Sequence, residues 1–186
     1  DSGSVDETWE WDGINWTLRN PEHKPGAQDR RALAYDAARQ VTVLFTYSSD
    51  YYNRYPETWE WNGTDWVQRS AAASPGPRDL PAMAYDSSAQ RVLVVDGYDY
   101  AAGNYVSDLW SWDSAAGTWH EDSAQPVARS YLGMAYDSAR NVTVLYGGGQ
   151  MSAYTTRVLD DTWEENGSAW IRRQPSTNPP TLLSHS

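Results

Sequence analysis

The chain repeats one stretch, Asp6-Glu7-Thr8-Trp9-Glu10-Trp11-Asp12-Gly13-Ile14-Asn15-Trp16, four times with variations. The second copy, residues 56–66, is nearly identical, and the later copies begin at Asp108 and Asp161. All eleven Trp residues of the chain fall in these copies, and Glu165 holds the place of a twelfth. The leading Trp residues lie 50, 51 and 53 residues apart. A period near 50 residues indicates an array of similar structural units.

Each copy is preceded by two further patterns that predict short strands. The first is an apolar stretch that ends in Tyr-Asp, at Asp36, Asp86 and Asp137, where the Asp is expected to open a turn. The second is a β-branched run after that turn, over residues 41–45, 92–95 and 142–146. These runs are too short for buried helices and rich in strand formers. The Thr-Trp-Glu-Trp stretches alternate polar with apolar residues, which is the period of a half-buried strand.

One unit is therefore expected to hold four antiparallel strands, a to d along the chain, with the Trp-x-Trp stretch as strand c. Asp12-Gly13 and Asn62-Gly63 are hairpin-turn signals between strands c and d. A four-stranded unit near 50 residues is one blade of a β-propeller. The sequence thus predicts an all-β fold with about three and a half blades. The half blade lies in residues 1–20, the blades in residues 21–70, 71–123 and 124–174, and a tail or the start of a further blade in residues 175–186.

These features resemble the Kelch family of repeat proteins over residues 5 to about 174. The likeness rests on the Pro-x-Arg lead-in to strand a at Arg78, with its counterpart Arg129, and on the aromatic-Asp that ends strand a. It also rests on Gly147-Gly148 after strand b and on the Trp residues of strands c and d. Thr46-Tyr47 departs from the Gly pair in the first full unit. The resemblance implies Kelch-type four-stranded blades.

The two faces of such blades differ in sequence. The a–b and c–d turns are near copies of one another, whereas the b–c loops differ and concentrate Tyr, Ser, Asp, Asn and Gly, a mixture typical of binding surfaces. In Kelch relatives this face commonly holds the partner pocket, and Arg at the lead-in position can line it. We expect the ligand-binding residues to be Arg30, Arg31, Tyr47, Asp50, Tyr51, Tyr52, Arg78, Asp96, Tyr98, Asp99, Tyr100, Arg129, Tyr131 and Gln150.

Structural roles for the same residues stay open at this point. Arg78 and Arg129 are equally interpreted as hydrogen-bond donors between blades, and the Tyr-rich loops as solvated or packed on each other. The Trp residues are interpreted as the packing core of stacked blades. Asp96 and Asp99 beside Gly97 form a weak candidate for a calcium site, and no metal is expected.

Composition excludes several classes of partner. The formal charge of −11 and the pI near 4.5 disfavour nucleic acid and anionic membrane surfaces. No apolar run approaches the roughly 18 residues of a membrane span, so membrane insertion is not expected. The absence of Cys excludes disulfides and thiolate metal sites. An extracellular or cell-surface location is the expectation that fits this acidic chain.

The sequence favours a non-catalytic binding module for a glycan or a protein ligand. Its three His residues occupy unrelated points of the repeat, and it has no catalytic triad spacing, His pair or phosphate-binding loop. No catalytic residue and no cofactor are therefore expected. Two alternatives remain: a structural self-assembly element, as an oligomer or extracellular filament subunit, and a Kelch-type carbohydrate-active enzyme such as a mutarotase.

Three and a half blades do not close a ring, and the open blade faces would expose apolar surface. We therefore expect a homo-oligomer or the continuation of a longer chain. The oligomer could be a closed pair or a head-to-tail filament.

Overall fold

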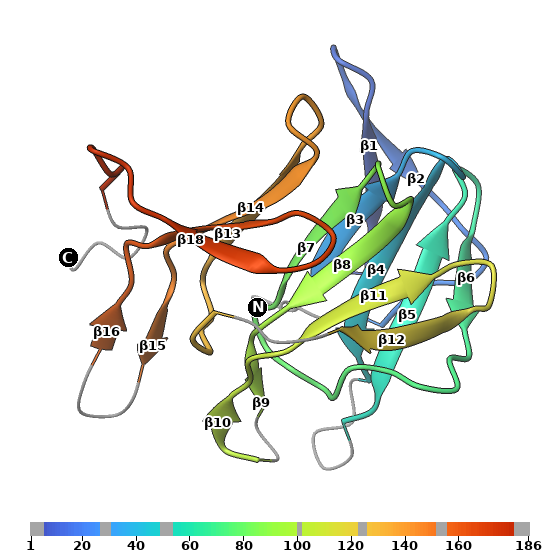
Figure 1. The fold of residues 1–186 in the computed structure, drawn as a ribbon. Coiled ribbons are helices and arrows are strands. Elements are labelled where there is room, and N and C mark those ends of the chain that lie inside the picture. Colours follow the sequence, from blue (N-terminus) through green and yellow to red (C-terminus); the bar gives the residue numbers. More distant parts are fainter. Residues whose placement is uncertain are drawn as a thin grey trace.

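The computed structural model describes residues 6–26, 31–48, 54–99, 102–122, 126–151 and 156–180 of the 186-residue chain. Over these ranges the chain forms eighteen β-strands and no helix (Figure 1), so the predicted all-β class is confirmed. It follows that no described segment is a helix long and apolar enough to cross a membrane.

Twelve strands form three four-stranded antiparallel sheets, in which neighbouring strands follow one another along the chain. Sheet 1 holds β3 (Ala32–Asp36), β4 (Val41–Tyr47), β5 (Pro56–Trp61) and β6 (Trp66–Arg69). Sheet 2 holds β7 (Ala82–Asp86), β8 (Arg91–Val95), β11 (Leu109–Asp113) and β12 (Thr118–Asp122). Sheet 3 holds β13 (Gly133–Asp137), β14 (Val142–Tyr146), β17 (Thr162–Glu165) and β18 (Trp170–Arg173). The four predicted strands of each unit are present in the predicted order.

The remaining strands form three hairpins: β1 (Thr8–Trp11) with β2 (Trp16–Arg19), β9 (Tyr98–Asp99) with β10 (Asn104–Tyr105), and β15 (Gly149–Met151) with β16 (Thr156–Val158). The first is the strand pair predicted at the start of the chain. The other two lie in connections that the sequence presented only as loops.

Positive backbone φ angles explain these extra hairpins. Gly97 (φ +114°) and Gly148 (φ +88°) follow the ends of β8 and β14, in a conformation that favours glycine. A Cβ at Gly97 would lie 2.9 Å from the carbonyl oxygen of Asp79, so the chain can approach there only without a side chain. The strand after each glycine pairs with the lead-in segment of its own sheet, Tyr98 with Asp79 and Gly149 with Ser130.

The turns after the first strand of each sheet share one hydrogen-bond pattern. Asp36 Oδ1 accepts hydrogen bonds from the backbone amides of Ala38 and Arg39, and Asp86 and Asp137 do the same in the next two sheets. The predicted turn-opening role of these three Asp residues is confirmed. A short acceptor side chain thus satisfies two backbone amides within each turn. In the first two turns one of these amides, that of Ala38 or Ser88, also donates to a Tyr hydroxyl of the next sheet.

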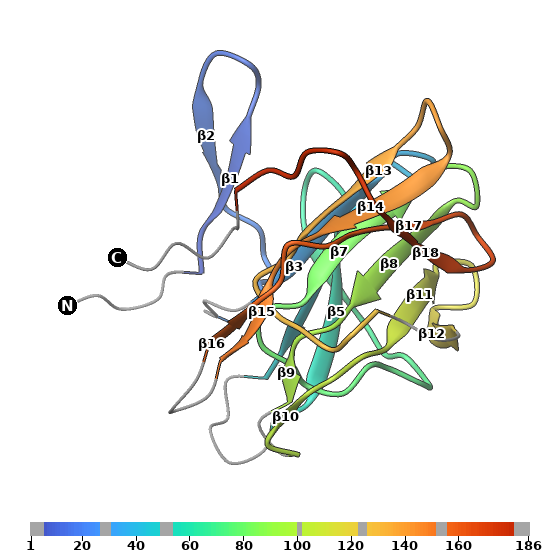
Figure 2. The ribbon, with the colours of Figure 1, turned by 60° about the vertical axis from the view of Figure 1, so that its left-hand side comes forward.

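The first strands β3, β7 and β13 lie side by side, so that sheet 2 is packed between sheets 1 and 3 (Figure 2). Both faces of β8 are buried as a result. Val92 and Val94 lie in the core shared with sheet 1, and Leu93 and Val95 in the core shared with sheet 3. This explains why the run has no polar alternation.

Trp side chains join sheet 2 to sheet 1 and sheet 1 to the β1–β2 hairpin. Trp112 Nε1 donates to Glu60 Oε1 at 3.0 Å, and Trp119 Nε1 donates to Thr58 Oγ1 at 2.8 Å. These bonds run from sheet 2 to sheet 1 and are buried. They supply partners for indole N–H groups that would otherwise be unsatisfied.

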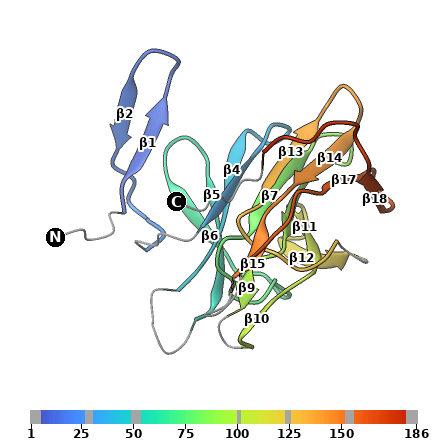
Figure 3. The same cartoon turned by 90° about the vertical axis from the view of Figure 1, so that its left-hand side faces the viewer.

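The same pair of bonds occurs one unit earlier. Trp61 Nε1 donates to Glu10 Oε1 at 2.7 Å, and Trp66 Nε1 donates to Thr8 Oγ1 at 2.8 Å. These two bonds attach the β1–β2 hairpin to sheet 1, beside which it stands at the opposite end of the molecule from β17–β18 (Figure 3).

Replacing Thr58 by Val tests the Trp–Thr bond, because Val keeps the shape and removes the acceptor. The buried N–H of Trp119 is then unpaired, and we expect a loss of about 1–3 kcal/mol in the free energy of unfolding, measured by urea titration. Thr46→Val is the matched control: Thr46 is equally buried, and its hydroxyl has no hydrogen-bond partner in the part of the chain that the structure describes. That variant should be neutral or slightly stabilising. Equal losses in both variants would contradict the assignment.

Candidate functional site

The predicted ligand face is the side on which β9–β10 and β15–β16 project, at the bottom of Figure 1. Five of the predicted residues, Arg30, Asp50, Tyr51, Tyr52 and Tyr100, lie outside the described residues. The other nine fall into an arginine pair, a tyrosine-centred contact between sheets, one isolated carboxylate and four residues of mixed exposure.

Arg78 and Arg129 are buried, with exposed fractions of 4% and 0%. Arg78 donates to both carboxylate oxygens of Asp108 and to the carbonyl oxygens of Gly76 and Asp96. Arg129 donates in the same way to both carboxylate oxygens of Asp161 and to the carbonyl oxygens of Val127 and Gly147. Bidentate, buried guanidinium groups of this kind fix local geometry. Both residues therefore have structural partners, but these hydrogen bonds lie within their own units and not between blades as the alternative interpretation expected.

Tyr47 and Tyr98 meet around a residue that the sequence did not single out as a ligand contact, Asp79. The buried hydroxyl of Tyr47 donates to Asp79 Oδ1 at 2.9 Å, and the backbone of Asp79 exchanges two hydrogen bonds with Tyr98. The guanidinium of Arg54 lies 5.0 Å from the centre of the Tyr47 ring. The ring of Tyr98 packs edge-on against Tyr105 at 5.0 Å. This cluster ties the end of sheet 1 to the start of sheet 2.

The other predicted residues differ in how they face solvent. Arg31 and Asp99 are half-buried, and Gln150 Nε2 donates to the Ala128 carbonyl oxygen at 2.6 Å. Tyr131 is 43% exposed, and Tyr55, which the sequence did not select, is 64% exposed. These two rings therefore offer exposed aromatic surface beside the hairpins.

Asp96 is the isolated carboxylate of this side. It is 1% exposed, has φ +55°, and neither of its carboxylate oxygens accepts a hydrogen bond from a described residue. Burial raises the pKa of Asp96 to about 8, although the charge of Arg129, whose Nε lies 3.9 Å away, opposes the shift. No group of three or more His, Asp or Glu side chains suited to a metal ion occurs among the described residues, so the weak calcium hypothesis gains no support.

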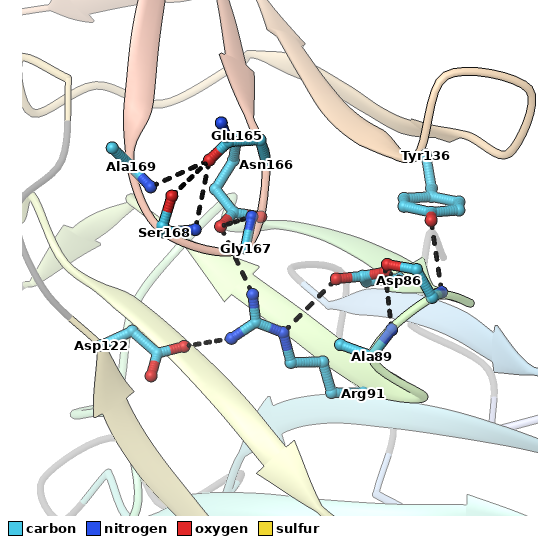
Figure 4. Close-up of polar contacts among 11 residues, drawn as sticks. Asp86, Ala89, Arg91, Asp122, Tyr136, Glu165, Asn166, Gly167, Ser168 and Ala169 are labelled. Carbon is cyan, nitrogen blue, oxygen red and sulfur yellow. Dashed lines mark hydrogen bonds and ion pairs between the residues drawn. The ribbon is translucent and has the colours of Figure 1, made fainter.

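A second polar cluster lies between sheets 2 and 3, at the opposite side from the hairpins. Arg91, at the start of β8, reaches three carboxylates: Asp122 at 2.9 Å, Glu165 at 3.4 Å and Asp86 at 3.5 Å (Figure 4). A cavity of about 100 Å³ adjoins it, bounded by Leu109 and by residues 167–170 of the β17–β18 turn.

Two buried atoms at this cavity, Glu165 Oε2 and the indole Nε1 of Trp170, have no hydrogen-bond partner among the described residues. Burial raises the pKa of the Glu165 carboxyl, and the Gly167 amide and Arg91 only partly offset this. The missing partners follow from the sequence of the repeat. Leu109 and Ser111 occupy the positions at which the other interfaces have their Thr and Glu acceptors. The cavity offers one donor and one acceptor to water or to a small polar molecule. In the sequence, the only sign of this cavity is Glu165 at the position where a twelfth Trp would stand.

Comparison of the chain with protein-family models gives no match, and comparison with curated proteins gives none either.

The buried carboxyl of Asp96 makes stability depend on pH. Because its pKa is about 8 in the folded protein and ordinary in the unfolded chain, its protonated form stabilises the fold at low pH. That stability is lost as the pH rises from about 4 to about 8. Asp96→Asn keeps the shape, tolerates positive φ and carries no charge. We expect this variant to be more stable than the wild type, by an amount that grows between pH 5.5 and 8 in urea titrations.

Asp113→Asn is the control, since Asp113 is exposed and the amides of Ala116 and Ala115 lower its pKa. Its stability difference from the wild type should not grow over that pH range. A pH-independent difference for Asp96→Asn would contradict the buried-acid assignment.

Proposed function

We propose that the chain forms a Kelch-type β-propeller, or a segment of one, and acts as a non-catalytic binding module for a glycan or a protein. Three observations support the propeller. Each full unit is a four-stranded antiparallel sheet in chain order, the first strands of successive sheets are neighbours, and Trp bonds at the same positions join the β1–β2 hairpin to sheet 1 and sheet 1 to sheet 2. These features support the proposal because propeller blades are four-stranded sheets repeated around an axis.

One observation carries the binding role. The hairpins β9–β10 and β15–β16 project from the same side, and backbone pairs anchor each of them to the lead-in segment of its own sheet. Their side chains nevertheless differ, since Tyr98 and Tyr105 stand in one and Gln150 and Arg157 in the other. Varied loops held on a rigid scaffold are where binding residues concentrate. An extracellular or cell-surface location remains part of this proposal.

The exposed tyrosines beside the hairpins test it. The double variant Tyr55→Ser, Tyr131→Ser removes both rings, and we expect at least a tenfold loss of affinity for any ligand found by glycan arrays or pull-downs with the wild type. Tyr35→Ser is the control, because Tyr35 is equally exposed but lies on β3 rather than beside the hairpins. Undiminished binding by the double variant would place the site elsewhere.

A further inference from the structure

Two unit-to-unit contacts in this chain use the same four positions. A strand-c Trp donates to a Glu of the preceding unit, and a strand-d Trp donates to a Thr of that unit. The two rings of each donor pair also keep one geometry. Their centroids lie 5.5 Å apart at 44° in Trp61–Trp66 and 5.3 Å apart at 48° in Trp112–Trp119. The contact is therefore a repeated, defined interface.

The β1–β2 hairpin carries the same donor pair without its acceptors. Trp11 and Trp16 are partners in the hairpin register, with ring centroids 5.5 Å apart at 42°. They are 51% and 64% exposed, and neither indole N–H has a partner among the described residues. The pair is thus already arranged as in the two buried interfaces.

Apolar neighbours extend this exposed face. Trp9 and Leu18 are partners two register positions along the hairpin and are also exposed. Alternation along β1 places Trp9 and Trp11 on one face, and Thr8 and Glu10, which accept from sheet 1, on the other. A contiguous exposed aromatic face rarely occurs without a protein partner.

Sheet 3 carries the matching acceptor pair without its donors. Glu164 occupies the position of Glu60, and it is held by Arg140 at Oε1 and by Arg173 at Oε2. Glu60 is held in the same way by Arg39 and Arg69, and in addition its Oε1 accepts from Trp112. Only the indole donor is missing at Glu164.

Thr162 supplies the second acceptor of that face. Its partner across the strands is Arg173, as Thr58 is paired with Arg69. The hydroxyl of Thr162 makes no hydrogen bond with a described residue, and a hollow of about 250 Å³ lies beside it, bounded also by Pro175 and Asn178. Among the described residues, no indole N–H donates to Thr162 as that of Trp119 donates to Thr58. The end of the described chain borders this face, where the hydroxyl of Tyr146, the register partner of Thr162, donates to the carbonyl oxygen of Pro179.

We propose that a second copy of this chain covers these two faces, with Trp11 and Trp16 of one copy donating to Glu164 and Thr162 of the next. Within one copy, sheets 1 and 2 stand between the hairpin and sheet 3 (Figure 3), so the two faces meet only across copies. The contact is head-to-tail, because each copy offers one donor face and one acceptor face. It is independent of any ligand at the b–c hairpins.

Two variants separate the faces. The donor variant is Trp11→Ser with Trp16→Ser, and the acceptor variant is Thr162→Val with Glu164→Gln. We expect the wild type to associate with increasing concentration in sedimentation-velocity experiments, and each variant alone to associate at least about tenfold more weakly. Mixing the two variants should restore a complex of one copy of each, because each retains the face that the other has lost.

Ile14→Ser is the matched control, since Ile14 is exposed at the hairpin turn and lies outside the Trp face. It should associate like the wild type. Urea titration of every variant checks the fold, and Thr162→Val alone replaces the acceptor variant if that variant unfolds. A monomeric wild type, an acceptor variant that still associates, or a mixture that forms no complex would each overturn the proposal.

Discussion

The bond from an indole N–H into a carboxylate of the preceding unit is the contact on which this structure depends. Glu60 is almost fully buried, and burial alone would raise its pKa. Hydrogen bonds from Arg39, Trp112 and Arg69 outweigh that effect and hold the pKa of Glu60 below its ordinary value. A buried carboxylate needs all of these partners, so the buried carboxylate of sheet 1 is completed by a residue of sheet 2.

The interface between sheets 2 and 3 replaces this contact by other residues. Between sheets 2 and 3, Ser111 replaces the Glu acceptor and Glu165 replaces its Trp donor. The acceptor position therefore holds no carboxylate that would need an indole N–H. Arg91 instead forms ion pairs with Asp122 of its own sheet and with Glu165 of sheet 3. The exchange is incomplete, since Leu109 gives Trp170 no acceptor and a polar cavity remains.

The side that carries the β9–β10 and β15–β16 hairpins is stabilised by different contacts. Its buried arginines and Tyr47 are bonded within the scaffold, which leaves the exposed tyrosines and the divergent hairpins as the surface that varies. Asp96 is the exception, because it is buried and has no hydrogen-bond partner among the described residues. The charged form of Asp96 lowers the stability of the fold above neutral pH. The equivalent position in sheet 3 is occupied by a glycine, Gly147.

The sequence by itself determined the all-β class, the four strands of each unit and the Asp turns, because strand periodicity and turn chemistry act over a few residues. It also marked Glu165 as the break in the Trp pattern. Only the tertiary structure decided that Arg78 and Arg129 are buried in ion pairs and that the b–c segments form hairpins. Likewise, only the structure placed Trp11 and Trp16 in the open. Burial and pairing depend on segments some 20 to 60 residues apart in the chain, and local pattern does not encode that proximity.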